Sequence, residues 1–130
     1  MYRAVTRKIE VKVTPRFESE RSSPASGYYF WSYTIDIANH GSETVQLKTR
    51  HWRITDAMGR LQEVKGPGVV GEEPTLKPGE SFEYTSGVPL PTPSGFMAGN
   101  YGMITDSGFR FEIEIPAFSL DAPSSARTLN

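Results

Sequence analysis

The amino-acid sequence predicts an all-β fold, an antiparallel β-sandwich of about seven to eight strands. Apolar residues alternate with polar ones over short runs, which is the period-two pattern of strands that bury one face. Glycine, proline, asparagine and aspartate gather between these runs, as tight turns require. No ten-residue window free of proline and glycine shows helical spacing. These observations are typical of a sandwich or barrel and leave no room for a substantial helix.

Each alternating run is expected to form one strand. Ile9, Val11 and Val13 alternate with charged residues in the first run, and Tyr29 to Ile37 forms the longest one. In chain order, the runs are residues 9–13, 29–37, 45–47, 52–54, 61–65, 82–84 and 109–115. Turn residues separate them at 39–42, 56–59, 77–79 and 106–108.

Two details favour an immunoglobulin-like sandwich. Trp52 falls on the third long strand, where such folds place a core tryptophan. The run Gly99-Asn100-Tyr101-Gly102-Met103 has the pattern of a tyrosine corner, with Met103 at the position where antibody domains keep a cysteine.

The remaining segments are interpreted as connections. Residues 18–26 are rich in serine and predict a long mobile loop. Pro89, Pro91 and Pro93 predict an extended segment that carries the chain between two sheets or protects an edge, with a groove ligand for a partner as the alternative. We therefore expect a single domain over residues 1–120 and a flexible C-terminal tail over 121–130.

Length and composition limit the classes of function. The 130 residues suit one domain with a core of its own, and the absence of cysteine excludes disulfides, thiolate metal sites and cysteine nucleophiles. No signal peptide and no apolar run of membrane-spanning length are found, so we expect a cytoplasmic protein without membrane insertion. The 14 basic and 15 acidic residues give a net charge of -1, so no DNA or RNA partner is expected. A local basic patch of Lys48, Arg50, Arg53 and Lys65 is the alternative to a solvated sheet face.

The motif Gly66-x-Gly68-x-x-Gly71 has the spacing of a dinucleotide-binding loop. Such loops lie between a strand and a helix, whose N-terminus binds the pyrophosphate. Here Glu72, Glu73 and a proline follow, so no helix is expected and the carboxylates would repel a phosphate. We therefore interpret the loop as a turn that needs the freedom of glycine. The alternative is a candidate phosphate-binding nest at Gly66, Gly68 and Gly71, with Glu72 and Glu73 as weak candidate Mg²⁺ ligands.

No other motif in the sequence predicts a catalytic or metal-binding site. His40 and His51 lack the spacing of a zinc site, and no serine stands in a Gly-x-Ser-x-Gly sequence. We predict that the protein is not an enzyme and has no cofactor.

Four stretches together resemble the ApaG family of small bacterial proteins. They are residues 51–59, 63–74, 76–87 and 92–103, and the resemblance covers roughly residues 7–118 apart from the loop 18–26. It implies an immunoglobulin-like or fibronectin-III-like sandwich. It also implies a link to cobalt resistance, to magnesium efflux and, through a neighbouring diadenosine tetraphosphate hydrolase gene, to dinucleoside polyphosphates. Similar domains in a eukaryotic F-box protein and a DNA-polymerase-delta-interacting protein look like interaction modules.

The functional expectation is a non-enzymatic binding module that presents loops or a strand edge to a protein partner. The alternative is a small-ligand binder that takes pyrophosphate or a nucleotide at residues 66–71. A homodimer is possible because sandwich edges pair readily.

Overall fold

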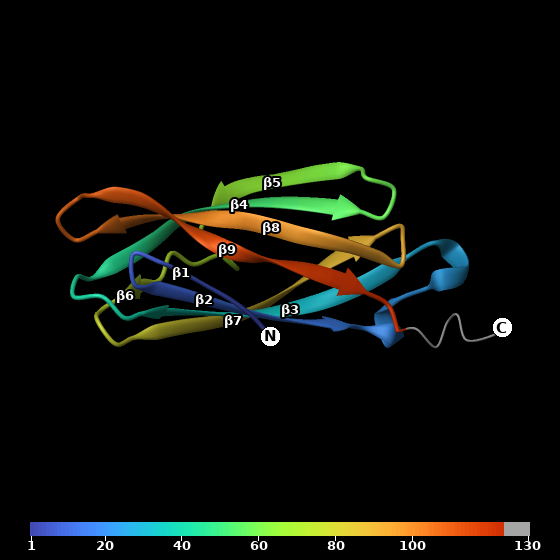
Figure 1. The fold of residues 1–130 in the computed structure, drawn as a ribbon, viewed down its shortest axis with the longest axis horizontal. Coiled ribbons are helices and arrows are strands. Elements are labelled where there is room, and N and C mark those ends of the chain that lie inside the picture. Colours follow the sequence, from blue (N-terminus) through green and yellow to red (C-terminus); the bar gives the residue numbers. More distant parts are fainter. Residues whose placement is uncertain (124–130) are drawn as a thin grey trace.

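The computed structural model describes residues 1–123 as two antiparallel sheets packed face to face (Figure 1). The first sheet has the order β1-β2-β3-β7, and the second has the order β5-β4-β8-β9 with the short β6 paired to β4. The predicted antiparallel β-sandwich is therefore confirmed. The strands are β1 (Tyr2–Thr6), β2 (Ile9–Phe17), β3 (Tyr29–Asn39), β4 (Val45–Asp56), β5 (Leu61–Pro67), β6 (Thr75–Leu76), β7 (Ser81–Leu90), β8 (Ser94–Thr105) and β9 (Arg110–Asp121).

The core lies between the sheets and follows from the alternation in the sequence. In β3, every second residue from Trp31 to Ile37 is buried, and the residues between them are half-exposed. Opposite them, Trp52 of β4 meets Phe118 of β9 edge to face, with ring centroids 6.0 Å apart. Trp52 is 3% exposed, so the predicted core position of this tryptophan is confirmed.

Residues 1–123 form nine strands rather than the predicted seven to eight. The runs 45–47 and 52–54 belong to one strand, β4, and β1, β6 and most of β8 were missed because they lack a clear apolar alternation. In β8, glycines stand where the backbones of two strands approach closely: a Cβ at Gly99 would lie 2.2 Å from the His51 carbonyl oxygen. The tyrosine-corner interpretation is wrong. Tyr101 lies within β8, is fully buried, and its hydroxyl meets the Tyr84 hydroxyl rather than a backbone group.

The connections and the end of the last strand complete the description of the fold. The loop 18–26 contains two short 3-10 helices, η1 (Ser19–Arg21) and η2 (Pro24–Ser26). The proline-rich segment carries the chain from β7 in one sheet to β8 in the other, as predicted. No helix within residues 1–123 has the length and apolar character needed to cross a membrane. β9 ends at Asp121, so most of the predicted tail lies outside the described residues.

The two long sides of the sandwich differ. On one side β1 and β9 lie together, where the Glu114 amide donates to Thr6 Oγ1 at 3.1 Å and the Tyr2 and Ser119 hydroxyls are 2.9 Å apart. We call this the closed side. On the other side the last strands of the two sheets are β7 and β5, and a pocket lies between them. We call this the open side.

Candidate functional site

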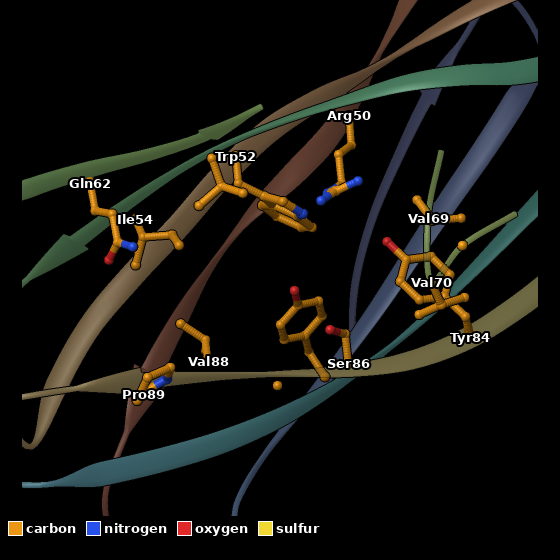
Figure 2. A pocket seen from close by; sticks show the side chains of 14 residues that line it. Arg50, Trp52, Ile54, Gln62, Val69, Val70, Tyr84, Ser86, Val88 and Pro89 are labelled. Atoms are coloured by element: carbon orange, nitrogen blue, oxygen red, sulfur yellow. The ribbon is translucent and has the colours of Figure 1, made fainter. Parts of the chain in front are cut away.

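A well-formed cavity lies at the open side, and we call it the open-side pocket. Its volume is about 430 Å³. Figure 2 shows Arg50, Trp52 and Ile54 of β4 facing Ser86, Val88 and Pro89 of β7 across it. The glycine-rich segment after β5 forms one end of the pocket through residues 69–71. Concave sites with an apolar lining and a few polar groups are the usual places where ligands bind.

Arg50 is the one charged residue, among those described, that lines the pocket. It is half-buried, and its Nη1 donates to the carbonyl oxygens of Pro67 at 2.8 Å and Gly68 at 3.0 Å. The guanidinium also lies against Gly66, where a Cβ would be 3.1 Å from both Nη1 and Nη2. Gly66 therefore leaves the space in which the guanidinium is held.

Three tyrosines add further hydroxyl groups at or beside the pocket. Tyr33 and Tyr84 line the pocket, and the Tyr84 and Tyr101 hydroxyls are 2.5 Å apart. Burial raises the pKa of all three phenols above the ordinary value of 10.0. They are therefore neutral hydroxyl groups at physiological pH, able to donate or accept hydrogen bonds but not to carry charge.

The glycine loop uses most of its amides within the backbone. The Gly68 amide donates to the Lys48 carbonyl at 2.9 Å, and Val69 and Glu72 exchange amide-to-carbonyl hydrogen bonds of 2.8 Å each. Gly68 and Gly71 have positive φ values of 61° and 80°, and Val70 between them has a φ of 43°. A Cβ at Gly68 would lie 2.3 Å from the Glu72 carbonyl oxygen, whereas nothing lies within 4 Å of one at Gly71. A tight turn thus accounts for these glycines.

The candidate magnesium ligands do not converge. Glu73 pairs with Lys48 at 2.6 Å, and both Glu72 and Glu73 are exposed. No group of three or more histidine or acidic side chains that could hold a metal ion is found within residues 1–123.

The four basic residues proposed as a patch do not share one surface. Lys48 is neutralised by Glu73, and Arg50 faces the pocket. Arg53 lies on the opposite face of β4 from Arg50, because side chains alternate along a strand.

The two histidines lie in separate places. His40 Nε2 is 2.9 Å from Glu10 Oε1, and Arg3 also binds that carboxylate. The hydrogen bonds from His40 and then from Arg3 lower the pKa of Glu10. His51 Nε2 is buried without a hydrogen bond, 3.6 Å from Glu63. Neither histidine lines the open-side pocket.

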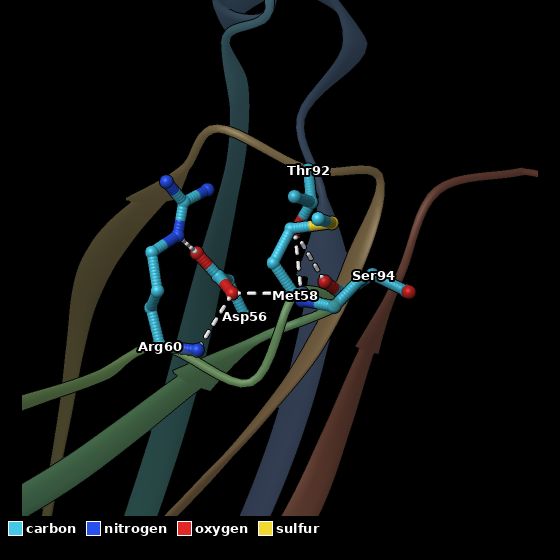
Figure 3. Close-up of polar contacts among 6 residues, drawn as sticks. Asp56, Met58, Arg60, Thr92 and Ser94 are labelled. Carbon is cyan, nitrogen blue, oxygen red and sulfur yellow. Dashed lines mark hydrogen bonds and ion pairs between the residues drawn. The ribbon is translucent and has the colours of Figure 1, made fainter.

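A second polar cluster fixes the turns at one end of the sandwich (Figure 3). Asp56 accepts hydrogen bonds from the amides of Met58 at 2.8 Å and Arg60 at 3.1 Å, and from Arg60 Nε at 2.9 Å. Thr92 Oγ1 accepts from the Ala57 amide at 3.1 Å and donates to the Ser94 carbonyl at 2.7 Å. This cluster joins the β4–β5 turn to the β7–β8 connection and is structural.

Sequence reasoning named Arg50 and the glycine loop but not the pocket. The sequence places Arg50 only in a candidate basic patch and Tyr84 only in the predicted strand 82–84, and Ser86 belongs to no predicted element. The available signal was the alternation that places Arg50 on the same face as Trp52 and Ile54. An arginine on the inner face of a strand is a candidate for a binding role.

Comparison with known proteins identifies the family. A family model described as the ApaG domain matches residues 19–105. The match includes residues 19–26, so the expectation that this loop lies outside the resemblance was wrong. Proteins named Protein ApaG from Bradyrhizobium diazoefficiens and Rhodopseudomonas palustris are 69% and 67% identical over 130 residues, 100% of both chains in each case.

A solved structure supports the same assignment. The crystal structure of an ApaA protein from Bordetella pertussis has a TM-score of 0.87 and 50% identity, and the match covers 88% of this chain and 94% of that one. Sequence and structure agree over nearly the whole length. The chain belongs to the ApaG domain family.

Proposed function

We propose that this chain is a non-catalytic binding module that receives an extended segment of a partner protein along its open side. The observation that carries the proposal is the difference between the two sides of the sandwich. The closed side is covered by the contact of β1 with β9, while β7 and β5 end their sheets with the open-side pocket between them. A free strand edge beside a pocket is the arrangement with which strand addition binds peptides.

The backbone of β7 supports this mode of binding. The Asn39 amide donates to the Glu80 carbonyl, and hydrogen bonding alternates along an antiparallel pair. The backbone groups of Glu83, Thr85 and Gly87 therefore point away from β3, toward the free edge. A partner strand could pair with them and place every second side chain over the pocket.

The chemistry of the pocket supports binding rather than catalysis. Its lining within the described residues offers no histidine, aspartate or glutamate as a general base, and Ser86 therefore has no partner that would activate it. A phosphate-bearing metabolite at residues 66–71 is less well supported, because the amides of Gly68, Val69 and Glu72 already donate to backbone carbonyls.

Peptide selection tests the proposal. A displayed library of random peptides is selected against the whole chain, and the recovered peptides are measured against Ser86→Trp and Thr85→Trp. Ser86 lines the pocket, whereas Thr85 is its neighbour on the outer face of the same strand. We expect Ser86→Trp to abolish binding and Thr85→Trp to retain it.

A scan of backbone N-methylation along a recovered peptide then tests the strand pairing. Methyl groups at alternate residues should block binding, and methyl groups at the residues between should be tolerated. The proposal fails if no peptide is recovered, or if Ser86→Trp binds the recovered peptides as well as the wild-type chain does.

A further inference from the structure

We infer that Arg50 makes the open-side pocket selective for a carboxylate carried by the bound segment. This inference rests on the proposed function and names the chemistry of the partner. Its basis is a charge that the pocket leaves without an acidic partner. No carboxylate within residues 1–123 forms an ion pair with Arg50, and no acidic residue of that part of the chain lines the pocket.

The Arg50 guanidinium is held in place, but not all of its nitrogens donate hydrogen bonds to the described residues. Nη1 donates to the Pro67 and Gly68 carbonyls, and the plane of the group rests against Gly66. Nε and Nη2 donate no hydrogen bond to the described residues. These two nitrogens form the edge with which arginine binds a carboxylate through two parallel hydrogen bonds. Because the side chain is already fixed, little further ordering is needed when the anion arrives.

Partial burial strengthens the attraction between this cation and an incoming anion. Arg50 is half-buried and lines the pocket together with the buried Trp52 and Tyr84, so water screens its charge less than at an open surface. A half-buried cation without an acidic partner also has an incomplete set of interactions, which a carboxylate would complete.

A single carboxylate fits the site better than a phosphate does. The pocket supplies one cation among its described lining residues, and the neighbouring loop has few free amides. A phosphate group carries more charge and usually needs several cations or amides. The lining also offers apolar side chains, including Ile54, Val64 and Val88. We therefore expect an aspartate, a glutamate or a C-terminal carboxylate next to an apolar residue in the bound segment.

The test uses the peptides recovered from selection and three arginine variants. Arg50→Gln removes the charge, Arg50→Lys keeps the charge without the two-pronged edge, and Arg53→Gln is the control on the opposite face of the same strand. Each acidic peptide is paired with a copy in which the acid is replaced by its amide, at the side chain in one set and at the C-terminus in the other. The two sets distinguish the two sources of the carboxylate.

We expect Arg50→Gln to weaken binding of the acidic peptide about tenfold or more, and to leave binding of the amide copy nearly unchanged. Arg50→Lys should give an intermediate loss, and Arg53→Gln should bind as the wild-type chain does. Equal affinity of the amide copy also shows that Arg50→Gln still folds and keeps its pocket.

Two different failures can be told apart. If peptides bind but show no acidic residue, or if Arg50→Gln loses the same affinity for the acid and the amide copy, this inference is overturned and the proposed function stands. If no peptide binds the wild-type chain, the proposed function is overturned and the inference falls with it.

Discussion

Gly66, Gly68 and Gly71 each have a separate structural task, although their spacing imitates a nucleotide-binding motif. Gly66 leaves room for the Arg50 guanidinium, Gly68 lets the chain pass the Glu72 carbonyl, and Gly71 adopts a positive φ of 80°. A motif of this kind identifies a binding loop only when its surroundings also match, and here no helix follows it.

Substitution of Gly68 and of Gly71 by alanine separates the cost of steric overlap at the Cβ from the cost of a positive φ. Gly68→Ala places a Cβ 2.3 Å from the Glu72 carbonyl oxygen at φ of 61°, so we expect a loss of about 2 kcal/mol or more in the free energy of unfolding. Gly71→Ala is strained only by the left-handed backbone conformation, so we expect a loss of about 1 kcal/mol in the free energy of unfolding. Denaturant unfolding of the two variants measures which one loses more free energy of unfolding. Equal losses would contradict these separate roles.

The turn between β4 and β5 is held by a carboxylate whose charge contributes to stability. Burial acts to raise the pKa of Asp56, but the hydrogen bonds from Arg60 and Met58 outweigh it, so the pKa lies below the ordinary value of 3.8. Because the pKa of Asp56 is lowered in the folded state, its charge contributes fully to stability at pH values above the ordinary pKa of 3.8. This contribution is lost as the pH falls through the lowered folded pKa.

Asp56→Asn is therefore expected to destabilise the protein at neutral pH. The difference in free energy of unfolding between this variant and the wild type should become smaller at acidic pH. Denaturant unfolding at about pH 7 and about pH 3 measures this change. Asp106→Asn is the control, because the Asp106 side chain is exposed at a turn and forms no hydrogen bond or ion pair with residues 1–123. A difference for Asp56→Asn that stays constant with pH would contradict an electrostatic role.

Sequence periodicity predicted the long strands well, because burial of one face imposes alternation on them. It failed for β8, where glycines such as Gly99 serve close backbone approach rather than side-chain packing. It also failed for the two-residue β6, which is too short to show a period. The candidate site was only partly predicted. Arg50 and Ser86 stand on different sheets, and only the packing of the sheets brings them to one pocket.

At the scale of the whole molecule, one side of the sandwich is closed by contact between β1 and β9, and the other side has a pocket between β7 and β5. Thr6 and Tyr2 of β1 form hydrogen bonds with β9 at the closed side, and Arg50 lines the pocket at the open side. Family membership accounts for the fold, and this asymmetry is what supports the binding proposal.

The most direct measurement of the central claim is an NMR titration of the isotope-labelled chain with the tightest recovered peptide. Saturable amide shifts are predicted along β7, along β5 and at residues 69–71, with β1 and β9 unchanged. Shifts centred on β1 and β9, or no saturable shift at the open side, would contradict the account.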